Sequence, residues 1–137
     1  MLNVTIPVPS GWAAVPRSRG FSCPAVELAN ATRVSPEGEL DFATSPLLDD
    51  ALHRAEADAR LIVLDLRRLA FVDCSGLRVI VAAHHRARRR GGRLVVVRGA
   101  AAIERVLTLT GAHRELELVD LLPPSAAAPE LREFVTA

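Results

Sequence analysis

Residues 61–81 read LIVLDLRRLAFVDCSGLRVIV, and this stretch decides the fold class. It opens with LIVLDL, a short and nearly continuous apolar run of the kind found in strands that are covered on both faces. The residues from Gly76 to about Arg90 have the apolar spacing of a helix, and FVDCSGL forms a tight connection between the strand and this helix. Such a unit predicts an α/β fold with LIVLDL at the centre of the sheet.

The sequence before this stretch continues the alternation. AVEL (25–28) and ATRV (31–34) predict a short hairpin. A helix is expected to run to about Ala59 from Thr44 or Ser45, because either side chain can cap its first turn. The apolar stripe of this helix contains Leu47, Leu48, Ala51, Leu52 and Ala55.

The sequence after this stretch adds further elements. RLVVV (93–97) predicts a second buried strand, AAIERVLTL a helix that Gly111 ends, and ELELV a short strand. A last helix is expected from about Glu130, after the linker PPSAAAP (123–129). We therefore predict an α/β domain with a mostly parallel, mixed central β-sheet of four to five strands packed against about four α-helices.

The composition limits the chain to one such domain. It has 137 residues, 50% of them hydrophobic, with a formal net charge of +1 and two cysteines. Residues 1–24 hold four of the nine prolines, so we predict a loosely ordered arm at 1–24 and a domain at 25–137, although LNVTIPV could add an edge strand. No apolar run approaches the ~20 residues of a membrane span. No signal peptide is recognisable, and we expect a cytoplasmic protein without membrane contact.

The segment Asp73-Cys74-Ser75-Gly76-Leu77 is the sharpest candidate for chemistry. Ser75 is expected at the N-cap of the helix, where free backbone amides and a partial positive charge could hold a phosphate on its hydroxyl. Phosphorylation would then change a surface and leave the fold intact. From spacing alone, a serine that merely caps the helix is the better interpretation.

The helix that follows offers a candidate docking face. At 100° per residue, one face of this helix carries Leu77, Ile80, Val81 and His84. The opposite face carries Val79, Ala82, Ala83 and Arg86, with Arg78 and Arg89 alongside. Small apolar and basic side chains on an outward face suit a protein partner. The alternative is a solvated arginine face whose alanines only favour helix.

Three other kinds of site are disfavoured. Cys74 could act as a nucleophile, but His84 lies ten residues further along the same helix, roughly 15 Å away along the axis. Adjacent histidines on a helix point apart, so we expect no metal site, no catalytic residue and no cofactor. HHRARRRGGR (84–93) lacks the aromatic residues that stack on bases, so no direct nucleic acid binding is expected.

A family resemblance shifts the interpretation of Ser75. GELDFATSPLL, LIVLDLRRLAFVDCSGLRVIV and GGRLVVV, in this order and spacing, resemble the STAS domain of bacterial anti-sigma factor antagonists over roughly residues 25–122. The resemblance implies that Ser75 is the phosphorylated serine, and Cys74 occupies a position that is commonly serine. Asp41 and Asp73 match acidic positions beside the phosphoacceptor. Their alternative role is a hydrogen bond to the loop or to the helix start.

The resemblance also implies a function by partner switching. The unmodified protein would bind an anti-sigma factor with a histidine-kinase-like ATPase fold and free a sigma factor for transcription. That anti-sigma factor would also be the serine kinase, and a PP2C-type phosphatase would reverse the mark, so the chain itself would be a substrate and not an enzyme. The alternative is a non-phosphorylated STAS scaffold or transport-accessory module. The predicted partner-binding residues are Asp41, Asp73, Cys74, Gly76, Arg78, Val79, Ala82 and Arg86.

Overall fold

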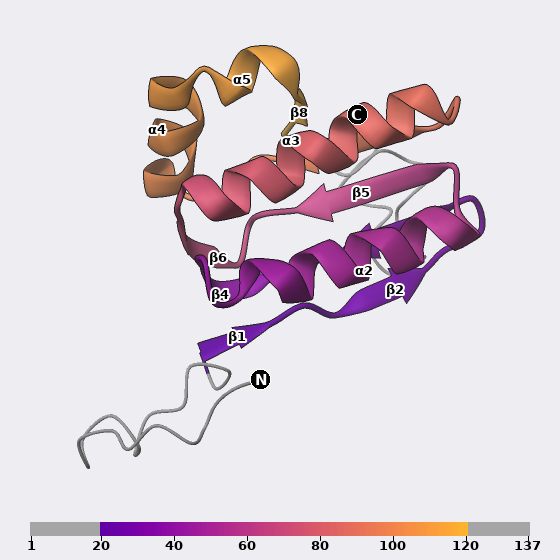
Figure 1. Ribbon diagram of the computed structural model, residues 1–137, viewed down its shortest axis with the longest axis horizontal. Coiled ribbons are helices and arrows are strands. Elements are labelled where there is room, and N and C mark those ends of the chain that lie inside the picture. Colours follow the sequence, from indigo (N-terminus) through magenta and orange to yellow (C-terminus); the bar gives the residue numbers. More distant parts are fainter. Residues whose placement is uncertain (1–19, 121–137) are drawn as a thin grey trace.

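The computed structural model describes residues 20–120 (Figure 1). The edge strand considered for LNVTIPV, the linker at 123–129 and the helix expected from about Glu130 lie outside the described residues. Within them, four short strands come first, and helices and strands then follow in a mixed order: a helix, two strands, a helix, a strand, two helices and a final strand.

A five-stranded mixed sheet forms the centre of the fold. Its strand order is β2-β3-β5-β7-β8, with β2 antiparallel to β3 and every other pair parallel. The prediction of a hairpin followed by parallel strands is confirmed. The bounds are β2 Ala25–Glu27, β3 Ala31–Val34, β5 Leu61–Asp65, β7 Arg93–Val97 and β8 Glu117–Val119.

Strand β5 is buried on both faces, which explains its continuous apolar run. Ile62 and Leu64 belong to the larger core cluster, whereas Val63 packs with Ala31 and Val95 in a second cluster. Ile62, Val63 and Leu64 are each 0% exposed. Because alternate residues of a strand point to opposite faces, the four successive apolar residues at 61–64 fit a strand at the centre of the sheet.

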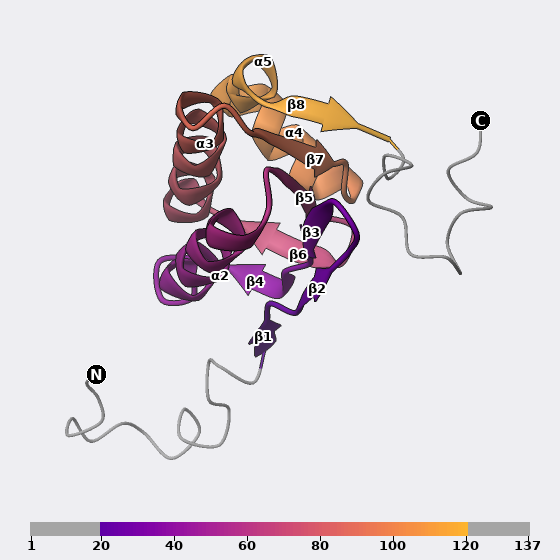
Figure 2. The ribbon, with the colours of Figure 1, turned by 90° about the vertical axis from the view of Figure 1, so that its right-hand side faces the viewer.

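Four helices are described: α2 Ser45–Asp58, α3 Cys74–Arg89, α4 Ala101–Thr110 and α5 Ala112–Glu115. Helices α2 and α3 pack side by side on one face of the sheet (Figure 2), and α4 packs near β6, described next. The predicted apolar stripe of α2 is buried, except for Leu47, which is 46% exposed.

A second, three-stranded sheet was not predicted. Its strands are β1 (Phe21–Ser22), β4 (Glu37–Leu40) and β6 (Leu69–Val72), in the order β1-β4-β6, and β4 and β6 are parallel. Buried Phe21 joins the core, so the folded part begins before residue 25, inside the segment expected to be an arm. These strands are short and each carries at least one exposed residue, which leaves little periodicity to recognise.

Gly76 brings α3 close to this small sheet. A Cβ at this position would lie 2.5 Å from Cγ of Leu40 and 3.0 Å from Cγ2 of Val72. Leu40 is 0% exposed and surrounded by core residues, so it has no space into which to move. The first turn of α3 therefore depends on a glycine for packing.

We predict that Gly76→Ala destabilises the protein by about 1–3 kcal/mol, because overpacking the core outweighs the ~1 kcal/mol that alanine gains in a helix. Urea denaturation followed by circular dichroism measures the change. Arg78→Ala, an exposed position in the same helix, is the control and should shift stability by less than ~0.5 kcal/mol. Equal stability of wild type and Gly76→Ala would contradict the packing argument.

Candidate functional site

The candidate site lies where β4 and β6 end side by side. Leu40 is in register with Val72, and the backbone N–H of Asp73 donates to the carbonyl oxygen of Leu40 at 3.1 Å. Because the two strands are parallel, their following segments leave the same edge of the small sheet. The loop at 41–44 and the start of α3 are thereby neighbours, which brings Asp41 and Asp73 to one edge.

Asp73, and not Ser75, caps helix α3. Asp73 has an extended backbone, and its Oδ1 accepts a hydrogen bond from the backbone N–H of Gly76 at 3.1 Å. The predicted cap was therefore misplaced by two residues, since an aspartate also suits an N-cap. Ser75 is the second residue of the helix and is half-buried, and its hydroxyl forms no hydrogen bond within residues 20–120.

The surroundings of the Ser75 hydroxyl favour an anion. The first turn of α3 contains no acidic residue, and its free amides carry the positive end of the helix dipole. Arg78 is exposed and follows Ser75 by three residues, a spacing that puts two side chains on the same side of a helix. A phosphate on Ser75 would thus meet backbone amides and one guanidinium.

Hydrogen bonds of Asp41 and Thr44 fix the conformation of the loop at 41–44. Thr44 is 4% exposed, and its Oγ1 accepts from the N–H of Asp41 and donates to the carbonyl of Glu39, each at 2.8 Å. In return, the N–H of Thr44 donates to Oδ1 of Asp41 at 3.0 Å. Both acidic residues of the site, Asp41 and Asp73, therefore bind local backbone amides.

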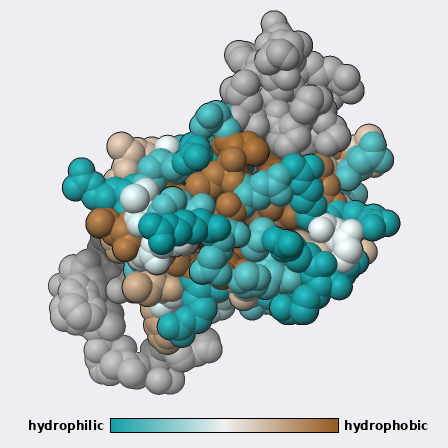
Figure 3. Space-filling model, turned by 90° about the horizontal axis from the view of Figure 1, so that it is seen from above, coloured by the Kyte–Doolittle hydropathy of each residue, from teal (hydrophilic) through white to brown (hydrophobic). Residues whose placement is uncertain are grey.

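A groove runs beside α3 from its first turn, which carries Ser75, toward α5. It encloses about 480 Å³ and is lined by Cys74, Leu77, Arg78, Val81, Ala82, His85, Thr110, Ala112 and Glu115. Across it, Nε2 of His85 lies 3.1 Å from a carboxylate oxygen of Glu115. Figure 3 looks onto the molecule from above and shows an apolar strip bordered by hydrophilic side chains.

The predicted docking face of α3 is only partly accessible. Arg78 is exposed and Ala82 is half-buried, but Val79 packs against the core and Ala83 is 0% exposed. The prediction that Ala83 faces outward is wrong, because α2 packs along that side of α3. Buried Gly76 contributes through packing, as described above.

Arg86 is part of the helix packing. Its guanidinium forms a two-pronged ion pair with Glu56 of α2, with Nη2 2.6 Å from Oε2 and Nε 2.9 Å from the same oxygen. The Glu56 side chain is only 9% exposed. This ion pair joins α3 to α2. Glu56 precedes Arg86 by thirty residues, so no local pattern marks the contact.

We predict that Arg86→Ala lowers the free energy of unfolding by about 1–3 kcal/mol, because it leaves the Glu56 carboxylate buried without its partner. Arg89→Ala, in the exposed last turn of the same helix, should change stability by less than ~0.5 kcal/mol. Urea denaturation of both variants makes the comparison. Similar stabilities of the two variants would show that Arg86 has no structural role.

The thiol and imidazole side chains do not form an obvious catalytic set. Cys74 is exposed, and burial raises the pKa of the Cys23 thiol to about 11, despite the opposing charge of Arg54. His84 is 5% exposed, and its Nδ1 is buried without a hydrogen-bond partner. Residues 20–120 contain no group of three or more potential metal ligands and no helix long and apolar enough to cross a membrane.

Burial of His84 predicts a pH dependence of stability. Burial, together with the nearby charges of His85 and Arg88, lowers the pKa of His84 below its ordinary value of 6.5. The unfolded chain then binds this proton more tightly than the folded one, so stability is complete above pH 6.5 and falls as the pH drops below it. The slope should not exceed ~1.4 kcal/mol per pH unit, the value for one proton.

Denaturant titrations at several pH values between 5 and 8 would measure this slope, and His84→Leu should flatten it. His53→Ala, at an exposed position, is the control and should keep the wild-type slope. If His84→Leu retained that slope, another group would be responsible.

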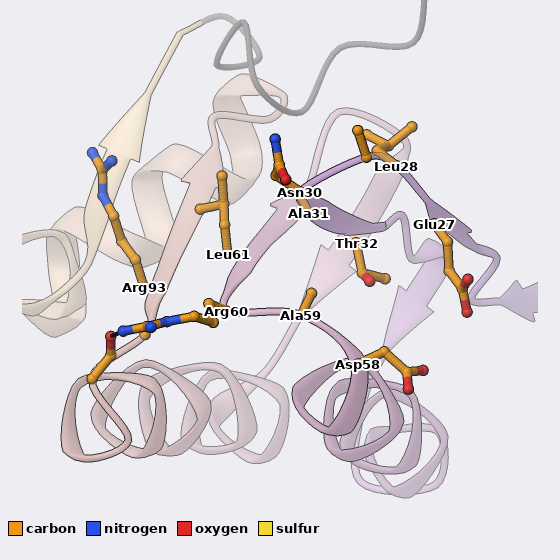
Figure 4. Close-up of a pocket in the computed structure, with 13 residues that line it drawn as sticks. Glu27, Leu28, Asn30, Ala31, Thr32, Asp58, Ala59, Arg60, Leu61 and Arg93 are labelled. Atoms are coloured by element: carbon orange, nitrogen blue, oxygen red, sulfur yellow. Dashed lines mark hydrogen bonds between the residues drawn. The ribbon is translucent and has the colours of Figure 1, made fainter.

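A second pocket lies at the other end of the sheet (Figure 4). It is lined by the β2–β3 turn, the starts of β5 and β7, and the carboxyl ends of α2 and α3. Arg60 crosses its floor and donates to the carbonyl of Gly91 at 2.8 Å. The negative charges of Glu27 and Asp58 balance the positive charges of Arg60 and Arg93 in the pocket lining. None of the predicted site residues lines this pocket.

Comparison with known proteins agrees with this fold. Residues 24–123 match the family model of the STAS domain, and the chain belongs to that family. It is 32% identical over 87 residues to an anti-sigma F factor antagonist from Paenibacillus polymyxa, which covers 61% of this chain and 73% of the relative.

Two solved structures are similar as well. The crystal structure of an anti-sigma factor antagonist from Mycobacterium paratuberculosis is 27% identical, with a TM-score of 0.68 over 74% of this chain and 87% of the other. A putative anti-sigma factor antagonist from Thermotoga maritima is 23% identical, with a TM-score of 0.66 over 82% and 93% of the two chains. The second likeness concerns the fold alone.

Proposed function

We propose that the chain is an anti-sigma factor antagonist that works by partner switching and is inactivated by phosphorylation of Ser75. The similar proteins described above carry that name. The observation that supports the switch is the state of Ser75 in the first turn of α3. Asp73 supplies the helix cap, so the serine hydroxyl has no structural hydrogen bond to lose within the described residues when it is modified.

The unmodified protein binds an anti-sigma factor that is also a serine kinase of the histidine-kinase-like ATPase fold, and a sigma factor is thereby released. This complex forms in the cytoplasm over the edge that carries Ser75. Asp41, Asp73, Cys74, Arg78 and Ala82 are the predicted contact residues that lie along this edge or the adjoining groove. Val79 and Arg86 act mainly through packing against the protein's own core and α2.

Phosphorylation transfers the terminal phosphoryl group of ATP to the Ser75 hydroxyl. The bond from Oγ to phosphorus forms, the bond from phosphorus to the ADP oxygen breaks, and the hydroxyl proton leaves to a base of the kinase. The product gains about −1.5 to −2 charges, which the amides of α3 and Arg78 accommodate. The same charge lies beside the acidic side chains of the site and disrupts docking. A PP2C-type phosphatase restores the hydroxyl.

We predict that Ser75→Ala folds, binds the kinase and resists modification, whereas Ser75→Glu folds and binds at least tenfold more weakly. The test uses purified ATPase-fold anti-sigma factors of the source organism, each with a demonstrated ATPase activity. Intact-mass spectrometry after incubation with ATP should show one added phosphate, located by peptide mapping to the peptide with Asp73-Cys74-Ser75 and absent in Ser75→Ala.

Stability should change little in either variant, because Ser75 is not the helix cap. Thermal melting checks this point and separates loss of binding from loss of fold. If an anti-sigma factor binds the chain, is active with ATP and leaves Ser75 unmodified, the switch is refuted. The chain would then be a non-phosphorylated STAS scaffold or transport-accessory module.

A further inference from the structure

Phe42 is a large apolar side chain that the protein leaves in water. It is 81% exposed, the highest value among the exposed large hydrophobic residues of the described part of the chain. Removing a phenylalanine side chain from water is worth about 1.5–3 kcal/mol, and within the domain this gain is not realised. The ring is therefore available to a partner.

The backbone that carries Phe42 is fixed. Besides the hydrogen bonds between Asp41 and Thr44, the N–H of Ser45 donates to the carbonyl of Asp41 at 2.7 Å, and Oγ of Ser45 donates to the carbonyl of Phe42 at 3.3 Å. Thr44 and Ser45 are both buried. An exposed ring on a rigid loop loses little entropy on binding, which is the property of aromatic anchors in protein interfaces.

Phe42 lies close to the phosphoacceptor turn. It follows Leu40 by two residues, which span at most ~7 Å, and Leu40 is hydrogen-bonded through its carbonyl to the N–H of Asp73. A standard interface covers about 800 Å² on each partner. An interface of this size over Ser75 would extend onto the loop that carries Phe42. Leu47, in the first turn of the adjoining helix, is a further large apolar residue that is 46% exposed.

We propose that Phe42 is the apolar anchor by which the anti-sigma factor/serine kinase holds this chain, inserted into an apolar pocket of that partner. The inference rests on the proposed function and adds to it a contact separate from the phosphoacceptor. Phe42 sets the affinity of the complex, and Ser75 sets whether the complex persists. The ring takes no part in phosphoryl transfer.

The test measures the dissociation constant of the purified kinase for the Ser75→Ala protein, with and without Phe42→Ala, by calorimetry. Using Ser75→Ala as background keeps phosphorylation out of the measurement. We expect Phe42→Ala to weaken binding at least tenfold and Phe42→Leu to restore most of the affinity. With Ser75 intact, Phe42→Ala should raise KM for phosphorylation and leave kcat unchanged. Melting temperatures should agree within about 2 °C, since the side chain is exposed.

Three results would overturn the inference. Affinity within twofold of the Ser75→Ala parent would exclude an anchor, and a fall in kcat at constant KM would place Phe42 in the chemical step. Sedimentation that shows a dimer lost in Phe42→Ala would assign the ring to a second copy of the chain. Each of these leaves phosphorylation of Ser75 in the wild type untouched, whereas a kinase that binds and never modifies wild-type Ser75 refutes the proposed function itself.

Discussion

The parallel pairing of β4 with β6 is the constraint on which the site depends. The hydrogen bond from Asp73 to Leu40 joins the two strand ends, and the missing side chain of Gly76 lets α3 start directly against Leu40. Together these contacts set the loop at 41–44 beside the first turn of α3. The five-stranded sheet does not include β4 or β6, so it does not itself bring these two segments together.

Asp73 and Ser75, two positions apart, have separate roles at the start of α3. The Asp73 carboxylate accepts a hydrogen bond from the backbone N–H of Gly76 and so stabilises the start of the helix. The hydroxyl of Ser75 forms no hydrogen bond in the described part of the chain. A residue that caps a helix cannot be modified without a cost to the fold, typically ~1 kcal/mol. The separation of cap and hydroxyl removes that cost. It is a physical reason why a modification here can alter recognition and leave the domain folded.

The sequence alone predicted elements whose signal is local. The double-sided burial of β5, the hairpin of β2 and β3, and the end of α4 at Gly111, with its φ of 81°, all follow from neighbouring residues. The small sheet was missed because its strands are short and partly exposed. The cap was misplaced because Asp73 and Ser75 both suit that position. The true environment of Arg86 depends on Glu56, on another helix, so no local pattern indicated it.

The two carboxylates of the site are held in place by the backbone. Both carboxylates, Asp41 and Asp73, are held by backbone amides at 3.0 and 3.1 Å, so their positions are fixed whether or not a partner is present. If Ser75 were phosphorylated, carboxylates held in this way would keep their places, and the added charge would change the potential of a surface of fixed shape. A rigid edge thus converts one added group into a change of surface potential. Flexible carboxylates would move away and weaken that change.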